Sequence, residues 1–216
     1  DLKNEIEDLS SENTDRLQFP NMHFFQPKWV ITVKNNTVQI HFPDSFDSKE
    51  IHQLFSKIMQ YQAHCWNNHV PKVQGRLSKE EYLKAVEKLQ VHIQRGDIYE
   101  VNFCQEYFAE EAILNPITTF NDLYDISEPP FACYYRYEDY HLMSASPERF
   151  LKKAGRKLIS QPIKGTRKRG GSIAEDNQLK KELLNCPKER SENVMIVDLV
   201  RNDLSRTASK ASVQVE

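Results

Sequence analysis

Two residues of opposite charge, Glu148 and Lys164, each stand in a turn bounded by proline or glycine. Pro147 and Pro162 fix their own φ angles and restrict the preceding residue to extended geometry, whereas Gly165 lets the backbone turn or approach a ligand closely. An unprotonated lysine amine is a nucleophile, and a protonated carboxyl group can act as a general acid. The pair would therefore suit a reaction in which an amine attacks carbon while a carboxylic acid protonates a departing hydroxyl group.

The segment between these two residues predicts how they meet. Residues 149–154 and 157–163 are strand-like runs on either side of Ala154 and Gly155, which is typical of a hairpin. A hairpin would bring Glu148 and Lys164 together although they are 164 − 148 = 16 positions apart. A lysine or glutamate taken alone is more often an exposed surface charge. The functional interpretation therefore requires an amine that is partly shielded from water, because only the neutral form is a nucleophile.

Two further features could bind anions or a metal. Thr166, Arg167 and the backbone amides around Gly165 and 170–171 could hold a carboxylate, although the loop is not a Walker A motif because the order GxxxxGK[ST] is absent. Glu192 could bind Mg²⁺, which takes one or two carboxylates and keeps several waters. The alternative for a glutamate on a helix is a solvated face.

Composition narrows the functional class. The chain has 216 residues, 39% hydrophobic and 28% charged, with a net charge of −2, which argues against a general role in binding nucleic acid or a membrane surface. No apolar run approaches the length of a membrane span, and no signal peptide is visible. The four scattered cysteines predict reduced thiols and a cytoplasmic protein. Because the chain begins without Met and ends on a strand-like VQVE, we expect a longer natural protein.

Hydrophobic periodicity predicts an α+β fold with antiparallel or mixed sheets and flanking helices, rather than βαβ repeats. Ser78 and Glu81 form a capping box. His64 and His69 are five positions apart, so a surface loop is favoured over a metal site. The expected helices cover 47–61, 78–95, 118–124, 174–184 and 188–206, and the expected strands 28–33, 37–42, 96–111, 131–137, 140–145 and the hairpin above.

Three separated motifs carry a family resemblance. They are RGDIYEVNF (95–103), SASPERF with PIKGTRKRG (144–150 and 162–170), and KERSENVMIVDLVRNDLSR (188–206). In order and spacing they resemble the chorismate-utilising enzymes over about residues 78–216. The resemblance implies that residues 1–76 are the family's N-terminal region and 77–216 the first part of its chorismate-binding catalytic domain.

Within that family, the PIKGT and ERSEN forms resemble the aminodeoxychorismate synthase component I branch. In anthranilate synthases the corresponding segment resembles PIAGT, with Ala at the position of Lys164. These enzymes also usually carry His at the position of Asn193. The implied activity converts chorismate and ammonia to 4-amino-4-deoxychorismate for p-aminobenzoate and folate synthesis. The alternatives are an anthranilate or isochorismate synthase, or an inactive fragment that only binds an amidotransferase.

The resemblance also implies roles for the residues above. Lys164 would attack C2 of the chorismate ring while the C4 hydroxyl leaves as water, aided by Glu148 as general acid. Ammonia, from a separate glutamine amidotransferase subunit or from solution, would then add at C4 and expel the lysine. Glu192 matches a ligand of Mg²⁺. The expected substrate-binding residues are Gly165, Thr166 and Arg167.

The chain departs from the family pattern in two ways. Relatives carry Gln where this chain has Glu100, and a carboxylate there would repel a dianionic substrate unless it is protonated or paired. The predicted strand 96–111 puts Glu100 on a polar face, which meets solvent in the commoner case or else lines a polar cavity. The chain also ends before later segments of the family pattern, so we expect these 216 residues alone to have little or no activity.

Overall fold

A computed structural model describes residues 8, 10–20, 22–62 and 70–216. The chain divides into two compact units, Asp1–Asn67 and Asn68–Glu216. The division expected between residues 76 and 77 concerns the domains of the family, and it stays a prediction. The two histidines considered above, at 64 and 69, lie outside the described residues.

The first unit contains the predicted hairpin and the predicted helix. Strands β1 (Val30–Lys34) and β2 (Thr37–His41) pair antiparallel. Their turn places Asn35 and Asn36 at φ angles of 47° and 61°, a left-handed geometry that asparagine tolerates. Helix α2 (Ser48–Gln60) begins after Asp47, whose carboxylate accepts a hydrogen bond from the backbone N–H of Lys49 at 3.0 Å.

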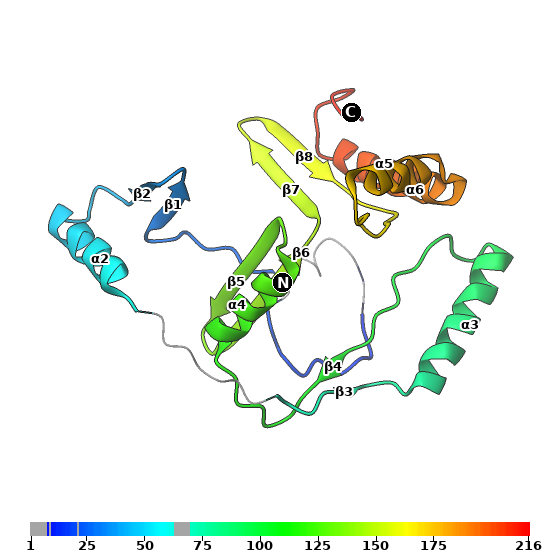
Figure 1. The fold of residues 1–216 in the computed structure, drawn as a ribbon, viewed down its shortest axis with the longest axis horizontal. Coiled ribbons are helices and arrows are strands. Elements are labelled where there is room, and N and C mark those ends of the chain that lie inside the picture. Colours follow the sequence, from blue (N-terminus) through cyan, green and yellow to red (C-terminus); the bar gives the residue numbers. More distant parts are fainter. Residues whose placement is uncertain (1–7, 9, 21, 63–69) are drawn as a thin grey trace. The chain divides into compact units, whose positions relative to one another are not determined.

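The second unit carries the predicted site, and its elements are drawn in Figure 1. The α+β class is confirmed, and every strand pair among the described residues is antiparallel. The elements are β3 (Gln74–Gly75), α3 (Lys79–Arg95), β4 (Tyr107–Phe108), α4 (Pro116–Ser127), β5 (Phe131–Tyr137), β6 (Tyr140–Ser146), β7 (Arg149–Ala154), β8 (Lys157–Gln161), α5 (Ile173–Asn185) and α6 (Pro187–Ser205).

Helix α3 has the ends that its sequence predicts. The Ser78 hydroxyl accepts a hydrogen bond from the N–H of Glu81 at 3.2 Å, and the Glu81 carboxylate accepts one from the N–H of Ser78 at 2.8 Å. Gly96 ends the helix at a φ of 80°, a left-handed conformation that glycine adopts without strain. Local capping therefore fixes this helix, and the segment that leads to Glu100 starts directly after it.

The strand expected over 96–111 is wrong for most of its length. Within this range only Tyr107–Phe108 is a strand, and it pairs with Gln74–Gly75. An alternating sequence becomes a strand only where a neighbouring backbone supplies hydrogen bonds, and the described residues supply that partner for two positions. The segment from Gly96 to Glu106 therefore runs as irregular chain, and its side chains find individual partners.

The hairpin between Glu148 and Lys164 is confirmed as β7 and β8. Gly155 occupies its turn at a φ of 59°. Strand β8 ends at Gln161, two residues earlier than predicted, because Pro162 has no N–H to donate to the ladder. Strands β5 and β6 precede this hairpin and pair along their whole length, and α4 packs against β6.

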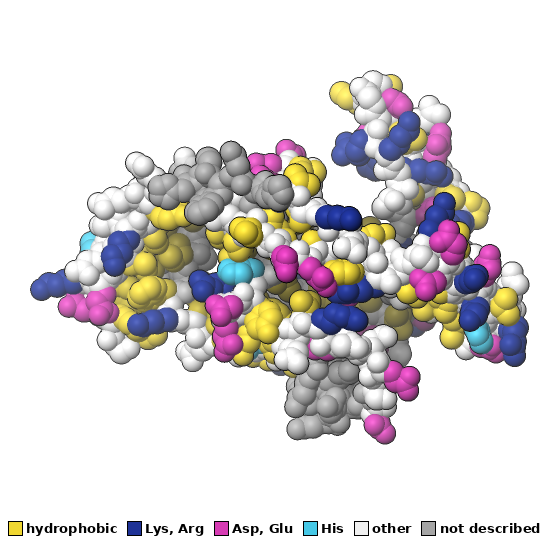
Figure 2. All heavy atoms as spheres, turned by 90° about the horizontal axis from the view of Figure 1, so that it is seen from below, with side chains coloured by type: hydrophobic (Ala, Val, Ile, Leu, Met, Phe, Trp, Pro, Cys, Tyr) yellow, Lys and Arg dark blue, Asp and Glu magenta, His cyan; other side chains and the backbone are white. Residues whose placement is uncertain are grey.

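Hydrophobic side chains remain widely accessible in both units. Ile51, with 9% of its surface exposed, is the one hydrophobic residue among those described that is buried, whereas Phe150 is 90% and Ile173 84% exposed. Figure 2 shows apolar side chains at the surface with charges of both signs among them. The strand pairs thus carry apolar faces that the described residues do not cover. Within the described ranges, no helix is long and apolar enough to cross a membrane.

Candidate active site

Lys164 forms an ion pair with Glu100, a residue 64 positions earlier in the chain. The Lys164 amine donates a hydrogen bond of 2.7 Å to Oε1 of Glu100. The two side chains are 31% and 32% exposed, so both are partly shielded from water. The irregular segment after α3 and the turn after β8 therefore meet at the lysine that the sequence singles out.

The charge state of Lys164 differs from the neutral amine that nucleophilic attack requires. The hydrogen bond with Glu100 is the largest cause that raises the pKa of Lys164 above its ordinary value, and the charges of Glu100, Glu192 and Glu148 raise it further. Partial burial acts in the opposite direction but is outweighed. The resting amine is consequently an ammonium group in an ion pair, and it must lose a proton before it can attack carbon.

Glu148 lies at the base of the same hairpin. Its Oε1 accepts a hydrogen bond of 3.0 Å from the backbone N–H of Ile163, the residue before Lys164. The N–H of Glu148 in turn donates to the hydroxyl of Ser146 at 3.2 Å, which fixes the turn around Pro147. The structure thus joins Glu148 to the backbone of Ile163, directly beside Lys164, as the hairpin predicts.

Gly165 lies close to Glu189 of α6, a contact that was not predicted from the sequence. Its φ is 79°, and a Cβ atom placed there would lie 2.5 Å from Oε2 and 3.1 Å from Cβ of Glu189 on α6. Glu189 lies one helical turn before Glu192, so both carboxylates belong to one helix face. That spacing is the signal by which Glu189 could have been found from the sequence.

We expect the Gly165→Ala variant to be destabilised by about 1–2 kcal/mol through its left-handed backbone, with a smaller further loss because Cβ of Glu189 must move aside while its carboxylate can rotate away. Gly155→Ala is the matched control, because Gly155 also has a positive φ but nothing lies within 4 Å of its added Cβ. Urea unfolding of the full-length protein measures both. Equal losses in the two variants would show that the contact with Glu189 adds nothing.

The hydrogen-bond partners in the loop after Lys164 differ from those expected. Thr166 and Arg167 are exposed, and their side chains make no hydrogen bond with any other described residue. The amides of Gly170 and Gly171, which the sequence offers to a ligand, are already engaged by the chain itself. They donate to Asp176 Oδ1 at 3.0 Å and to Glu175 Oε2 at 2.7 Å, at the start of α5. The side chains of Thr166 and Arg167 therefore have no partner among the described residues, whereas the amides of Gly170 and Gly171 do.

Glu192 could contribute one ligand to a metal ion. Its side chain is 40% exposed, and Oε1 lies 3.6 Å from the Lys188 amine one turn earlier on α6. No three His, Cys, Asp or Glu side chains form a metal-binding group among the residues that the structure describes. The donors present fit Mg²⁺, which accepts one or two carboxylates and completes its shell with water. They do not make a cage formed by protein alone.

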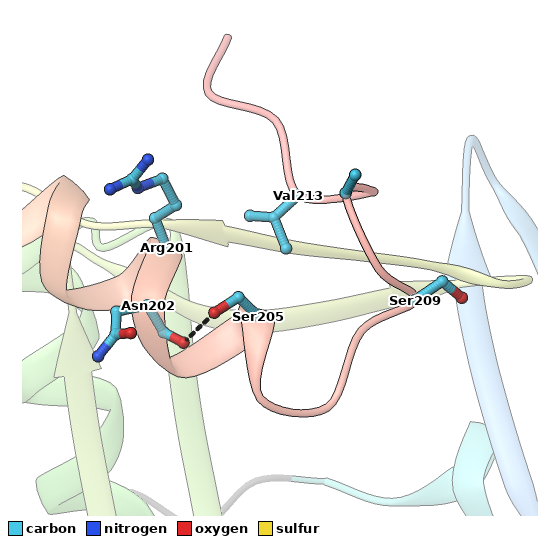
Figure 3. A pocket seen from close by; sticks show the side chains of 6 residues that line it. Arg201, Asn202, Ser205, Ser209 and Val213 are labelled. Atoms are coloured by element: carbon cyan, nitrogen blue, oxygen red, sulfur yellow. Dashed lines mark hydrogen bonds between the residues drawn. The ribbon is translucent and has the colours of Figure 1, made fainter.

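Several hollows lie along α6, and two of them differ in whether they contain a predicted site residue. One, of about 540 Å³, lies between the β7–β8 hairpin and α6, and its lining includes Glu148, Pro162, Ile196 and Leu199. The other, of about 330 Å³, lies at the C-terminal end of α6 and is shown in Figure 3, where the Ser205 hydroxyl donates to the carbonyl of Asn202 at 2.6 Å. The first hollow contains a predicted site residue, whereas the second contains none.

Comparisons with known proteins identify the family of the chain. Residues 1–216 match the family described as chorismate binding enzyme. The chain is 31% identical over 214 residues to the anthranilate synthase component I-like protein of Synechocystis sp., covering 98% of this chain and 44% of that protein. It is 30% identical over 237 residues to aminodeoxychorismate synthase component 1 of Bacillus subtilis, covering 97% and 47%. The chain thus spans about half the length of these curated relatives.

A solved structure supports the fold. The crystal structure of anthranilate synthase component I from Streptococcus pneumoniae TIGR4 matches with a TM-score of 0.83 at 22% identity, covering 99% of this chain and 50% of that one. At that identity the likeness establishes the α+β fold.

Proposed function

The chain belongs to the chorismate binding enzyme family, and from this premise we propose that the whole protein is the chorismate-aminating component I of an aminodeoxychorismate synthase. The observation that carries the proposal is Lys164 itself. It stands in the PIKGT motif, and its amine is surrounded by the charges of Glu100, Glu148 and Glu192 from three separate segments. An amine at this position supplies the nucleophile that covalent amination requires.

The proposed reaction divides one difficult substitution into two steps. The Lys164 amine, after losing a proton, forms a bond to C2 of the chorismate ring while the C4–O bond breaks. Glu148 protonates the departing hydroxyl group, which leaves as water, and the ring double bonds shift to accommodate the new bond. Ammonia then forms a bond to C4 and the C2–N bond to Lys164 breaks, which regenerates the lysine. General acid catalysis of this kind contributes about 10²- to 10⁴-fold.

The remaining residues would bind and orient the substrate. Arg167 and Thr166, exposed beside Lys164, are proposed to hold a substrate carboxylate, since a guanidinium group pairs with carboxylates in bidentate geometry. Glu192 would hold Mg²⁺, which neutralises carboxylate charge on the substrate when it is bound. Glu189, one helical turn before Glu192, lies against Gly165, so a larger residue at position 165 would displace the side chain of Glu189.

The experiment that tests the proposal is mass spectrometry of the full-length protein incubated with chorismate and Mg²⁺ without ammonia. We expect a mass increase equal to chorismate minus water on the peptide that contains Lys164. Addition of ammonia should release the adduct and yield 4-amino-4-deoxychorismate. An active full-length protein that never carries this adduct would rule out covalent amination through Lys164.

Anthranilate synthase is the second candidate, because relatives with that name also match, including one of Thermus thermophilus at 37% identity over 142 residues. The lysine in PIKGT favours the aminating reaction, and identification of the product by chromatography separates the two. Names of the form "component 1" among the relatives also support a partner subunit, for which we propose a glutamine amidotransferase that supplies ammonia. A chain that binds such a subunit but consumes no chorismate at full length would be a binding protein only.

A further inference from the structure

The residue paired with Lys164 is a carboxylate, Glu100, at a position where the family resemblance implies a neutral amide. That carboxylate lies 2.7 Å from the Lys164 amine and is still 32% exposed. A substitution that places a full negative charge against the nucleophile of a dicarboxylate-binding site should alter both the lysine and the substrate affinity.

We propose that Glu100 is a positioning residue that holds the Lys164 amine in an ion pair before the substrate binds, and that it weakens the attraction of the site for a dicarboxylate. The inference rests on the proposed function. Two physical effects support it. A bound dianion experiences repulsion from Glu100, and the positive charge of Lys164 that would attract the dianion is already balanced.

The groups around Lys164 determine how its reactivity depends on pH. Glu100 approaches from the segment after α3, Glu148 from the base of the hairpin, and Glu192 from α6, and all three stabilise the ammonium form. Glu100 is the largest of these influences because it alone contacts the amine directly among the described residues. Removing its charge should therefore make the neutral amine available at lower pH, while Glu148 and Glu192 keep their effect.

The test compares wild type with Glu100→Gln in the full-length protein. Glutamine keeps an oxygen that accepts the hydrogen bond from Lys164 but removes the charge. We expect the KM for chorismate to fall about 3- to 10-fold, which corresponds to about 1 kcal/mol of relieved repulsion. The midpoint of the pH profile for adduct formation at Lys164 should move to lower pH, because the carboxylate that raises the pKa of Lys164 most is removed.

Glu106→Gln is the matched control. Glu106 lies on the same irregular segment and also forms an ion pair, with Arg76 at 2.7 Å, but it does not contact Lys164. Its substitution should leave the KM and the pH midpoint unchanged. If Glu100 had a purely structural role, Glu100→Gln would behave like Glu106→Gln. Each would lose an ion pair and change in thermal stability, and neither would shift the pH midpoint.

Each outcome decides between the two claims. If the wild type forms no adduct at any pH, the proposed function fails. If the wild type forms the adduct but Glu100→Gln has the same KM and pH midpoint, only the role of Glu100 is overturned. If Glu100→Gln is folded yet forms no adduct at any pH, the carboxylate is required to accept a proton, and the role as a restraining ion-pair partner is likewise overturned.

Discussion

The Lys164→Ala variant of the full-length protein is expected to form no adduct with chorismate and to lose at least about 10³-fold in the rate of amination. The physical reason is that alanine offers no nucleophile, and the described neighbours of Lys164 are carboxylates that remain in place. Chorismate should still bind through Arg167 and Thr166, but more weakly, because Glu100 is left unpaired and repels the dianion. The adduct is measured by mass spectrometry, and the rate by the formation of 4-amino-4-deoxychorismate.

Lys168→Ala is the control for this substitution. Lys168 is exposed in the same basic loop, and its side chain makes no hydrogen bond or ion pair with another described residue. Its removal should leave the adduct and the amination rate within about twofold of wild type, because exposed charges that lack a partner contribute little. An amination rate for Lys164→Ala equal to that of Lys168→Ala would mean that the reaction does not pass through a covalent lysine intermediate.

The second large effect is expected for Glu148→Gln. Glutamine can still accept the hydrogen bond from the N–H of Ile163, so the turn at the base of the hairpin should keep its geometry. It cannot deliver a proton to the departing hydroxyl group. We therefore expect the rate of adduct formation to fall about 10²- to 10⁴-fold with little change in chorismate affinity.

Single-turnover kinetics, with the adduct trapped at increasing times, measures that rate. Glu138→Gln, in the exposed turn between β5 and β6, is the control for loss of one carboxylate and should react at the wild-type rate. If Glu148→Gln forms the adduct as fast as this control, another group protonates the leaving hydroxyl. In that case Glu148 would serve only to hold the backbone beside Lys164.

Local sequence signals predicted most of the elements, because those elements are fixed by contacts within a few residues. The capping box at Ser78 and Glu81 determines the start of α3, and the paired asparagines at 35 and 36 determine the turn of the first hairpin. Gly155 does the same for the β7–β8 turn. Each of these features has a physical cause that is readable within a window of four residues.

The conformation of the segment that contains Glu100 could not be predicted from local sequence signals. Its alternating pattern predicted a strand, but a strand also needs a hydrogen-bonding neighbour, and a local pattern does not supply one. For the same reason the partner of Lys164 could not be read from the sequence, since the two residues are 64 positions apart. The hydrogen bonds from the amides of Gly170 and Gly171 to Asp176 and Glu175 were likewise not predicted from the sequence.

The hydrogen bond between Ile163 N–H and Glu148 joins the two ends of the β7–β8 hairpin, so the distance from acid to amine is governed by the register of its two arms. A slip of one arm by one residue would turn its side chains to the opposite face, whereas residues added in the turn at Gly155, or in equal number to both arms, leave the open end as it is. A comparison of relatives that keep this lysine should therefore find the pairing of Arg149 with Gln161 retained even where the turn differs in length.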